Sequence, residues 1–111
     1  MDIQIGAALE TLPKIAASQD PFDLIFIDAD KTNTVPYFDW SLKLSRPGTV
    51  IVVDNVVRKG AVTDAKTTDK DVQGMRRFYD RLTNEPRVVA TAIQTVGSKG
   101  YDGFAIALVK A

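Results

Sequence analysis

Two stretches of this chain, LIFID at residues 24–28 and VIVVDN at residues 50–55, each join an apolar run to an acid. Each run has the length and the unbroken apolar character of a buried parallel strand. In open α/β sheets, ligands bind beyond the carboxyl ends of the strands, and neighbouring strands lie about 4.8 Å apart. We therefore expect Asp28, Asp54 and Asn55 to lie together, as hard oxygen donors of the kind that magnesium and calcium prefer.

The bulk composition fits one globular domain. The 111 residues are 45% hydrophobic and 25% charged, and 14 basic residues balance 14 acidic ones, so a dedicated nucleic-acid or anionic-membrane surface is not expected. No apolar stretch approaches the ~20 residues of a membrane span, and the first residues lack the features of a signal peptide. The chain has no cysteine and no histidine, which excludes disulfides, thiolate metal sites and a histidine base. These features favour a cytoplasmic location.

Around the two apolar runs, the sequence predicts alternating helices and strands. A strand over residues 23–27 is followed by a helix from about residue 34 to residue 45. Arg46-Pro47-Gly48 is expected to turn the chain into the second strand. Another short helix, ALETLPKIAA over residues 8–17, precedes the first strand, and Pro13 is expected near its start because proline is best tolerated in a first turn.

The second half of the chain adds a loop and a helix. Residues 58–70 are polar and are expected to form a flexible loop. Thr68 or Asp69 then caps a helix that carries one apolar stripe. The stripe contains Val72, Met75, Phe78, Tyr79 and Leu82. Met75 and Phe78 are interpreted as core residues, and so is Trp40 of the preceding helix.

Two strands are predicted to close the fold, over residues 88–96 and 104–109. The link between them, residues 97–103, is too short for a crossover helix, so the two strands should be antiparallel neighbours. The run at residues 24–27 does not alternate between polar and apolar residues, and both faces of that strand are therefore expected to be covered by protein.

With these elements, the sequence resembles the cation-dependent O-methyltransferases that use S-adenosylmethionine, the family of catechol and caffeoyl-coenzyme A methyltransferases. The match is carried by FDLIFIDADK (residues 22–31), RPG (46–48), DNV (54–56), GAV (60–62) and GFAIA (103–107). The resemblance extends over nearly the whole chain. The IDADK and DN motifs together, at this spacing, are far more specific than either motif alone.

The resemblance implies an α/β fold, the carboxyl-terminal half of a Rossmann-like class I methyltransferase. The family sheet has the order 3-2-1-4-5-7-6, and this chain would supply strands 4-5-7-6, with an antiparallel last pair and helices on the faces. Ile3 to Ile5 resembles a stub of strand 3. The family's glycine-rich turn after strand 1 and its acid after strand 2, which hold the methionine part and the ribose of the cofactor, have no counterpart here. We expect one partial domain over residues 1–111.

The resemblance also implies roles for a few polar residues. Asp28, Asp54 and Asn55 match the ligands of a divalent cation, which would be Mg, Ca or Mn. The alternative is that strand-end Asp and Asn residues only start turns or cap the next helix. Lys31 matches the lysine that helps to deprotonate the acceptor hydroxyl, and its alternative is a solvated loop lysine.

Cofactor and substrate contacts follow from the same comparison. Asp28 and Ala29 match positions that line the S-adenosylmethionine pocket, and Gly6-Ala7-Ala8 matches the stretch that faces the adenine ring, which makes Ala7 and Ala8 cofactor contacts. Asp30 is a candidate substrate contact, although an exposed turn aspartate is nearly as good an interpretation. Arg58 stands where many relatives carry an aromatic residue, which leaves the class of substrate open.

Several functions remain open. The leading hypothesis is methyl transfer to a hydroxyl of a catechol-like or other small-molecule acceptor; a relative that methylates a transfer-RNA hydroxyuridine is disfavoured by the neutral charge. The second is a catalytically inactive fold fragment that pairs with a complementary half or self-associates, as a homodimer or larger species, through the unprotected edge of the strand at residues 24–27. A generic nucleotide-binding module ranks last because the chain has no phosphate loop.

Overall fold

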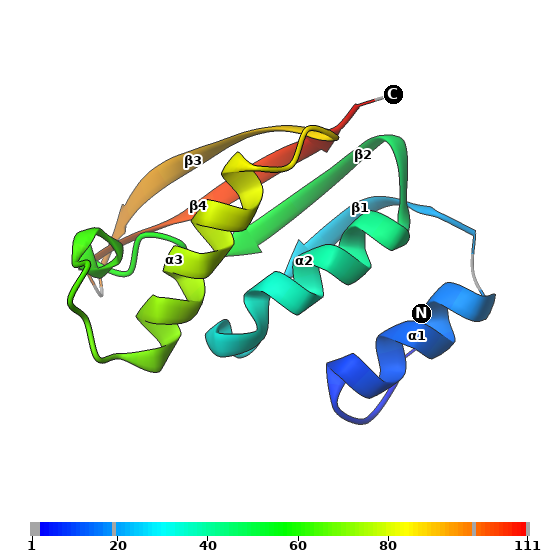
Figure 1. Ribbon diagram of the computed structural model, residues 1–111, viewed down its shortest axis with the longest axis horizontal. Helices are drawn as coiled ribbons and strands as arrows, with labels where there is room; N and C mark the ends of the chain where they lie inside the picture. Colours follow the sequence, from blue (N-terminus) through cyan, green and yellow to red (C-terminus); the bar gives the residue numbers. More distant parts are fainter. Residues whose placement is uncertain (1–2, 19, 99, 111) are drawn as a thin grey trace.

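The computed structural model describes residues 3–18, 20–98 and 100–110, and its centre is a four-stranded sheet (Figure 1). The elements run in the order α1 (Ala8–Ser18), β1 (Phe22–Ile27), the 3-10 turn η1 (Lys31–Asn33), α2 (Thr34–Lys43), β2 (Ser45–Asp54), the 3-10 turn η2 (Ala61–Thr63), α3 (Lys70–Thr83), β3 (Val88–Gly97) and β4 (Gly100–Val109). The helices α2 and α3 lie against one face of the sheet, and α1 lies beyond β1, beside α2. In the described ranges, no helix has both the length and the apolar character needed to cross a membrane.

The sheet has the strand order β1-β2-β4-β3. The strands β1 and β2 are parallel, and the other two pairs are antiparallel. This confirms the expected half of a Rossmann-like methyltransferase sheet, with its 4-5-7-6 order and antiparallel last pair. Ile27 pairs with Val53, so that the two strands deliver the next residues, Asp28 and Asp54, to the same edge of the sheet.

The core lies between the sheet and the helices α2 and α3. Phe38 of α2 and Phe78 of α3 are fully buried, and their rings meet edge to face with centroids 5.5 Å apart. Met75 is fully buried as well, which confirms the two core positions expected in the α3 stripe. Trp40 is only half-buried, because its ring lies at the rim of the core, where the Lys43 Nζ sits 4.4 Å from the ring centroid.

The start of α3 is fixed as the sequence predicts. The side chain of Asp69 accepts hydrogen bonds from the backbone N–H groups of Asp71, at 2.9 Å, and Val72, at 3.2 Å. These bonds satisfy two of the amides that a helix leaves without intrahelical partners in its first turn. The loop before the cap is more ordered than expected, since residues 58–70 contain the turn η2.

The expected turn at residues 46–48 lies inside a strand instead. The strand β2 begins at Ser45, and its pairing with β1 jumps from Phe22↔Ser45 to Leu24↔Val50, so that the intervening residues of β2 bulge outward. Thr49 holds the bulge, because its hydroxyl accepts the Arg46 N–H at 2.9 Å and donates to the Phe22 carbonyl at 2.6 Å. The helix before it accordingly ends at Lys43.

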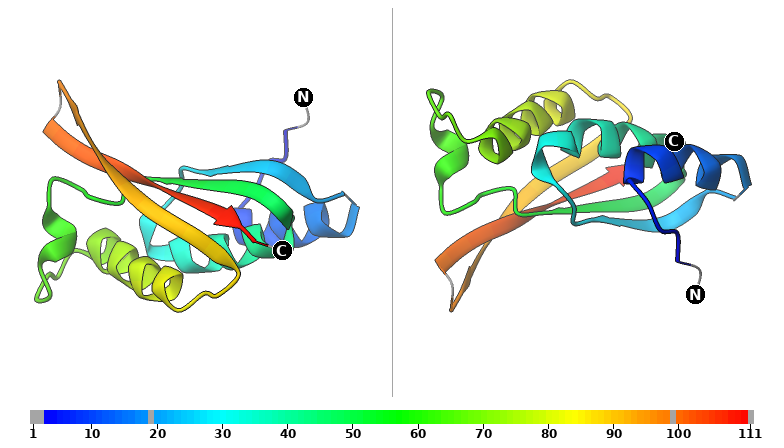
Figure 2. Two further views of the ribbon diagram at one scale, coloured as in Figure 1. Left: turned by 90° about the horizontal axis from the view of Figure 1, so that it is seen from above. Right: turned by 90° about the horizontal axis from the view of Figure 1, so that it is seen from below.

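The prediction that seven residues link the last two strands was also wrong. Pairing of β3 with β4 continues through Thr95↔Asp102 and Val96↔Tyr101 to Gly97↔Gly100. The ladder is built from backbone N–H and C=O groups, which glycine supplies as well as any other residue, so a glycine-rich stretch need not interrupt it. The resulting long hairpin extends beyond the ends of the other strands (Figure 2).

Two further expectations failed near the amino terminus. Ile3 and Ile5 lie outside any strand and are 71% and 94% exposed, because the described chain offers no neighbouring strand for them to pair with. Pro13 lies in the second turn of α1 and not at its start. The helix itself occupies the expected residues, with one residue more at its end.

The strand β1 is covered on one face only. Ile27 is buried beneath α2, whereas Leu24 and Phe26, which point the other way, are 64% and 61% exposed. Within the described residues, β2 is the only strand that pairs with β1, which leaves its other edge unpaired. The expectation that both faces are covered is therefore wrong for this chain on its own.

Candidate functional site

The candidate site lies at the edge of the sheet where β1 and β2 end. Asp54 is the last residue of β2, Asn55 follows it, and Asp28 follows the last residue of β1. Adjacent parallel strands lie about 4.8 Å apart, so the three residues lie at one edge of the sheet. Asn55 adopts a left-handed backbone conformation with φ of 61°, which turns the chain sharply away from the sheet after Asp54.

The three side chains present oxygen atoms that suit a hard cation. Asp28 Oδ1 pairs with Lys31 Nζ at 3.2 Å, and Asp54 Oδ1 accepts the Asn55 N–H at 2.8 Å. The amide nitrogen of Asn55 donates to Asp102 Oδ2 at 3.1 Å, which leaves the carbonyl oxygen of that amide for another ligand. Two carboxylates and one amide oxygen match the preference of Mg²⁺, Ca²⁺ or Mn²⁺ for oxygen donors. In the described part of the chain, no group of three Asp, Glu, His or Cys side chains could hold a metal ion. The set at this edge has two carboxylates, and its third donor is the amide oxygen of Asn55.

Lys31 is a buried lysine. It opens η1, and only 9% of the residue is exposed. Its carbonyl oxygen accepts the Thr34 hydroxyl at 2.9 Å, which ties the turn to the start of α2. Because the side chain is only 11% exposed and its Nζ lies against Asp28, the interpretation as a solvated loop lysine is wrong.

Asp30 is engaged by the turn that follows β1. Its carboxylate accepts hydrogen bonds from the Tyr37 hydroxyl, from Asn33 Nδ2 at 2.6 Å and from Thr32 Oγ1 at 3.4 Å. The hydrogen bond from Tyr37, followed by those from Asn33 and Thr32, keeps the pKa of Asp30 below its ordinary value. Burial, together with the hydrogen bond to Asp30, raises the pKa of Tyr37 to about 12. A substrate contact for Asp30 stays a prediction, and the arrangement shows a local role in joining η1 to α2.

A small cavity of about 210 Å³ lies where α1, α2 and the end of β1 meet. Ala8, Asp28 and Ala29 line it, and these are three of the four residues expected to contact the cofactor. The fourth, Ala7, is exposed in front of α1 and is not part of the lining. Other lining residues are mostly apolar, among them Leu12, Ile25, Ile27 and Leu44, and Tyr37 is the bulkiest polar one. The cavity therefore suits a flat, largely apolar group with a polar edge near Asp28.

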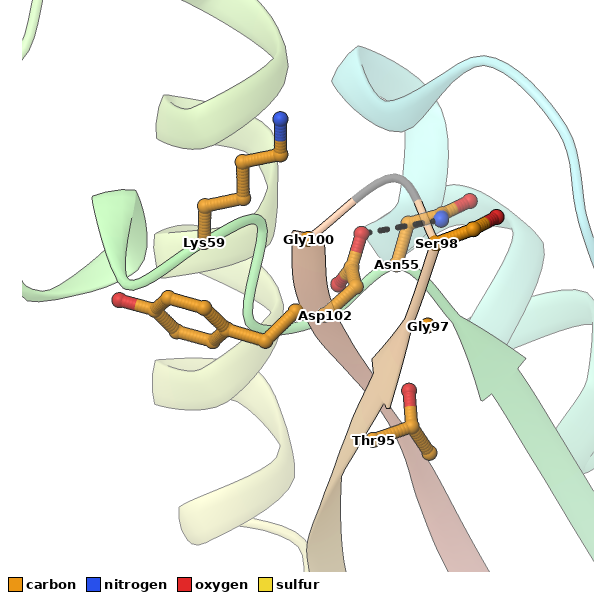
Figure 3. Close-up of a pocket in the computed structure, with 8 residues that line it drawn as sticks. Asn55, Lys59, Thr95, Gly97, Ser98, Gly100 and Asp102 are labelled. Atoms are coloured by element: carbon orange, nitrogen blue, oxygen red, sulfur yellow. Dashed lines mark hydrogen bonds between the residues drawn. The ribbon is translucent and has the colours of Figure 1, made fainter.

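Asp102 is a residue of this region that the sequence patterns did not reveal. Its Oδ1 accepts backbone N–H groups from Val57 at 3.1 Å, Arg58 at 2.7 Å and Gly103 at 2.8 Å, while Oδ2 accepts the Asn55 amide (Figure 3). Burial raises the pKa of Asp102, but the hydrogen bonds, led by that of Arg58, outweigh burial and hold it below the ordinary value. The sequence offers only a weak sign, one acid next to Gly103 at the start of an apolar strand.

A wider, open pocket of about 490 Å³ lies beside Asn55, between the end of the β3–β4 hairpin and the loop after β2. Asn55, Lys59, Thr95 and Asp102 are among its lining residues, and Figure 3 shows them around the hollow together with the glycines of the hairpin. Arg58 is turned elsewhere: its guanidinium lies 3.8 Å from Asp71 Oδ2 at the start of α3. The part of this pocket near Asn55 is therefore polar.

Comparison with known proteins shows to which family this chain belongs. The family model described as O-methyltransferase matches residues 1–108. The chain belongs to the O-methyltransferase family. A catechol O-methyltransferase of Mycobacterium tuberculosis is 51% identical over 110 residues, and one of Niastella koreensis is 50% identical over 111 residues. The family that the sequence motifs suggest is thereby confirmed.

Solved structures of the family share the fold of this chain. An O-methyltransferase from Bacillus cereus, solved in complex with SAH, superimposes with a TM-score of 0.94 at 60% identity. The alignment covers 98% of this chain and 50% of the Bacillus cereus protein. The two catechol O-methyltransferases are covered to 49% and 50% of their lengths, so this chain spans about half the length of the relatives that it matches.

Proposed function

We propose that this chain carries the cation-binding and hydroxyl-activating part of an S-adenosylmethionine-dependent O-methyltransferase that acts on a catechol-like small molecule. The observation that carries the proposal is the buried Lys31, whose Nζ lies 3.2 Å from Asp28 Oδ1 at the edge of the sheet where Asp54 also ends its strand. Family membership supports the reaction class, and the catechol O-methyltransferases that are 51% and 50% identical to this chain support a catechol as acceptor.

The donor set defines the proposed cation site. Asp28, Asp54 and Asn55 would hold Mg²⁺, Ca²⁺ or Mn²⁺ through their oxygens. When bound, the cation supplies positive charge that favours the ionised form of an acceptor hydroxyl. Three protein donors fill about half of an octahedral shell, which leaves room for the two adjacent oxygens of a vicinal diol and predicts weak binding by the chain alone.

Lys31 is proposed as the group that takes up the hydroxyl proton. In this step the neutral amine of Lys31 would accept the proton at Nζ, and the neighbouring carboxylate of Asp28 would stabilise the ammonium that forms. Burial of the side chain keeps water away from this transfer, so the proton passes between two positioned groups. Asp30 would remain the anchor of the turn that presents Lys31, with a substrate contact as an additional role.

The cavity at α1 is proposed to accept the adenine part of S-adenosylmethionine. Its small residues Ala8 and Ala29 leave room for a ring, and the polar edge at Asp28 offers a hydrogen-bond acceptor for the exocyclic amine. The bound cofactor supplies an electrophilic methyl group. The residues that hold the ribose and the methionine part in the family have no counterpart in these 111 residues, so we place those contacts on another segment.

Self-association is the second candidate function, and it is favoured by the open side of β1. Leu24 and Phe26 are exposed on the same face, and one edge of β1 is unpaired within the described residues. A second copy could cover this edge, most simply by two-fold symmetry.

Two measurements test the proposed function. Titration with Mn²⁺ should give a binding signal that Asp54→Ala abolishes and that Asp80→Ala, a change of an exposed α3 residue, leaves intact. For the reaction, the amino-terminal half of the Bacillus cereus relative is joined to this chain, and the fusion is given S-adenosylmethionine and catechol. We expect cation-dependent methylation that Lys31→Ala removes and Lys66→Ala does not. A folded fusion that binds the cofactor but methylates no catechol would contradict the proposed acceptor class.

A further inference from the structure

Asp102 ties the last strand of the sheet to the loop that follows β2. Three backbone N–H groups converge on its Oδ1, from Val57, Arg58 and Gly103, at 2.7–3.1 Å. The same two segments are joined by backbone hydrogen bonds from Val56 N to the Gly103 carbonyl, at 3.1 Å, and from Lys59 N to the Tyr101 carbonyl, at 2.9 Å. The loop is therefore fastened at several points to the start of β4, and the carboxylate of Asp102 accepts two of the backbone N–H groups of the loop.

The fastened loop has an unfavourable backbone. Asn55, Arg58 and Lys59 all have left-handed conformations, with φ of 61°, 51° and 56°. The left-handed conformation is unfavourable for residues with a Cβ atom, more so for Arg and Lys than for Asn, so this backbone persists only where its surroundings hold it. Asp102 contributes by accepting the N–H groups that this conformation turns inward.

The second oxygen of Asp102 fixes the orientation of the Asn55 amide. An ionised carboxylate can only accept hydrogen bonds, so it selects the NH₂ end of the amide, and Asn55 Nδ2 lies 3.1 Å from Asp102 Oδ2. The amide oxygen must then point away from Asp102, as Figure 3 shows. Asn55 stands directly after Asp54, at the sheet edge shared with Asp28.

We propose that Asp102 is a positioning residue for the divalent-cation site: it turns the oxygen of the Asn55 amide toward the cation and holds the loop that carries Asn55. This inference rests on the proposed function, because it assigns to Asp102 a part in that site without making it a ligand. Hydrogen-bonded partners of metal ligands typically change metal affinity 10- to 100-fold when they are replaced.

The substitution Asp102→Asn tests the proposal because it keeps the size of the side chain and changes its hydrogen bonding. The new amide has one oxygen, which the backbone N–H groups of residues 57, 58 and 103 occupy, and its NH₂ end faces Asn55. The Asn55 amide must then rotate, which presents its own NH₂ group to the cation. We expect the affinity for Mn²⁺, measured by calorimetry and by the electron paramagnetic resonance of free Mn²⁺, to fall about 10- to 100-fold. The control Asp80→Asn removes one exposed carboxylate and should leave the affinity within a few-fold of wild type.

Exchanging the two side chains provides the decisive rescue. In the double variant Asn55→Asp/Asp102→Asn, the amide at 102 donates to the carboxylate at 55, whose second oxygen faces the cation. Mn²⁺ affinity should return to within a few-fold of wild type and exceed that of Asn55→Asp alone, which carries the same added ligand charge. A merely structural role for Asp102 does not predict this gain from the second substitution. If Asp102→Asn alone fails to fold, the Mn²⁺ affinity of the double variant decides the question. Circular dichroism establishes whether each variant is folded.

A third test uses the wild-type chain. On addition of Mg²⁺, the nuclear magnetic resonance signal of the Asn55 side-chain carbonyl carbon should shift while the amide protons stay protected by Asp102. Each of three outcomes would overturn the proposal for Asp102 and leave the cation site standing. They are unchanged Mn²⁺ binding by Asp102→Asn, a folded double variant that does not recover Mn²⁺ affinity, and loss of protection of the Asn55 amide protons when Mg²⁺ is added. Absence of any Mn²⁺ binding by wild type would overturn the cation site of the proposed function and this role together.

Discussion

Gly74, in the middle of α3, lies directly against the backbone of Lys31. A Cβ atom at position 74 would come within 2.8 Å of both the Lys31 carbonyl carbon and the Thr32 Cα, and closer still to the Lys31 carbonyl oxygen. Glycine in a helix interior costs about 1 kcal/mol relative to alanine. Here its bare backbone allows α3 to close on η1, and this contact buries the lysine on which the proposed chemistry depends.

The substitution Gly74→Ala should therefore destabilise the protein although it raises helix propensity. The atoms that the new methyl group meets belong to backbone and cannot rotate away, so α3 and η1 must separate. We expect the free energy of unfolding to fall by about 1–3 kcal/mol, as for other overpacked cores. Urea denaturation followed by circular dichroism measures it.

The matched control is Gly97→Ala at the end of β3. A Cβ atom there meets nothing within 4 Å, so the stability should change by no more than about 0.5 kcal/mol. A Gly74→Ala variant as stable as wild type would show that η1 can move away from α3 without cost.

Glu85 predicts how stability depends on pH. Its buried carboxylate accepts hydrogen bonds from Arg87 Nε, at 2.9 Å, and from Arg81 Nη2, at 3.0 Å, and the bonds from Arg87 do most to lower its pKa, to about 2. Because the unfolded chain protonates this group near 4.5, the stabilisation is complete above pH 4.5 and is lost as the pH falls toward 2.

The variant Glu85→Gln isolates this contribution. At pH 7 it should be about 1–3 kcal/mol less stable than wild type, because two arginines lose a charged partner, and the difference should shrink as the pH approaches 2. Thermal unfolding between pH 2 and 7 measures it, with Asp80→Asn on the exposed face of α3 as control. A difference that does not vary with pH would exclude the ionic hydrogen bonds as its cause.

The open edge of β1 predicts association. Light scattering at micromolar concentration should report a dimer or larger species, because free backbone groups lie beside the exposed Leu24 and Phe26. Phe26→Lys should shift the population toward monomer. Val96→Lys serves as the control, since Val96 is also exposed but lies at the hairpin tip, far from β1. A well-folded wild-type monomer would defeat this prediction.

The chain alone should bind S-adenosylmethionine weakly and transfer little or no methyl group. It offers the proposed adenine cavity but no glycine-rich turn for the methionine part. Calorimetric titration with S-adenosylhomocysteine, run beside the full-length Bacillus cereus relative, measures the deficit. Affinity equal to that of the relative would mean that an associated copy completes the pocket.

The sequence predicted the parts of the fold that depend on side-chain pattern. The two apolar runs predicted β1 and β2 and the common edge for Asp28 and Asp54. Asp69 indicated the start of α3, because a capping carboxylate binds the amides two and three residues ahead of it.

The features that escaped prediction depend on contacts between distant backbones. The hairpin runs to Gly97 and Gly100 because strand pairing needs no particular side chain. Asp102 binds amides some 45 residues away, which no local pattern records. Gly74 did carry a sign: it interrupts the apolar face between Val72 and Met75, where only a close backbone neighbour favours a missing side chain.

The tether at Asp102 also sets the order in which the molecule can mature on the ribosome. Asp28, Lys31 and Asp54 emerge before Asp102, and the strands β1 and β2 can pair as soon as α2 has formed. The loop at residues 55–59 must wait, since the carboxylate that holds it follows the amides that it binds by 44 and 45 residues. During synthesis the lysine and its acid partner are thus assembled first, and the proposed cation pocket becomes competent only after the start of β4 has been made.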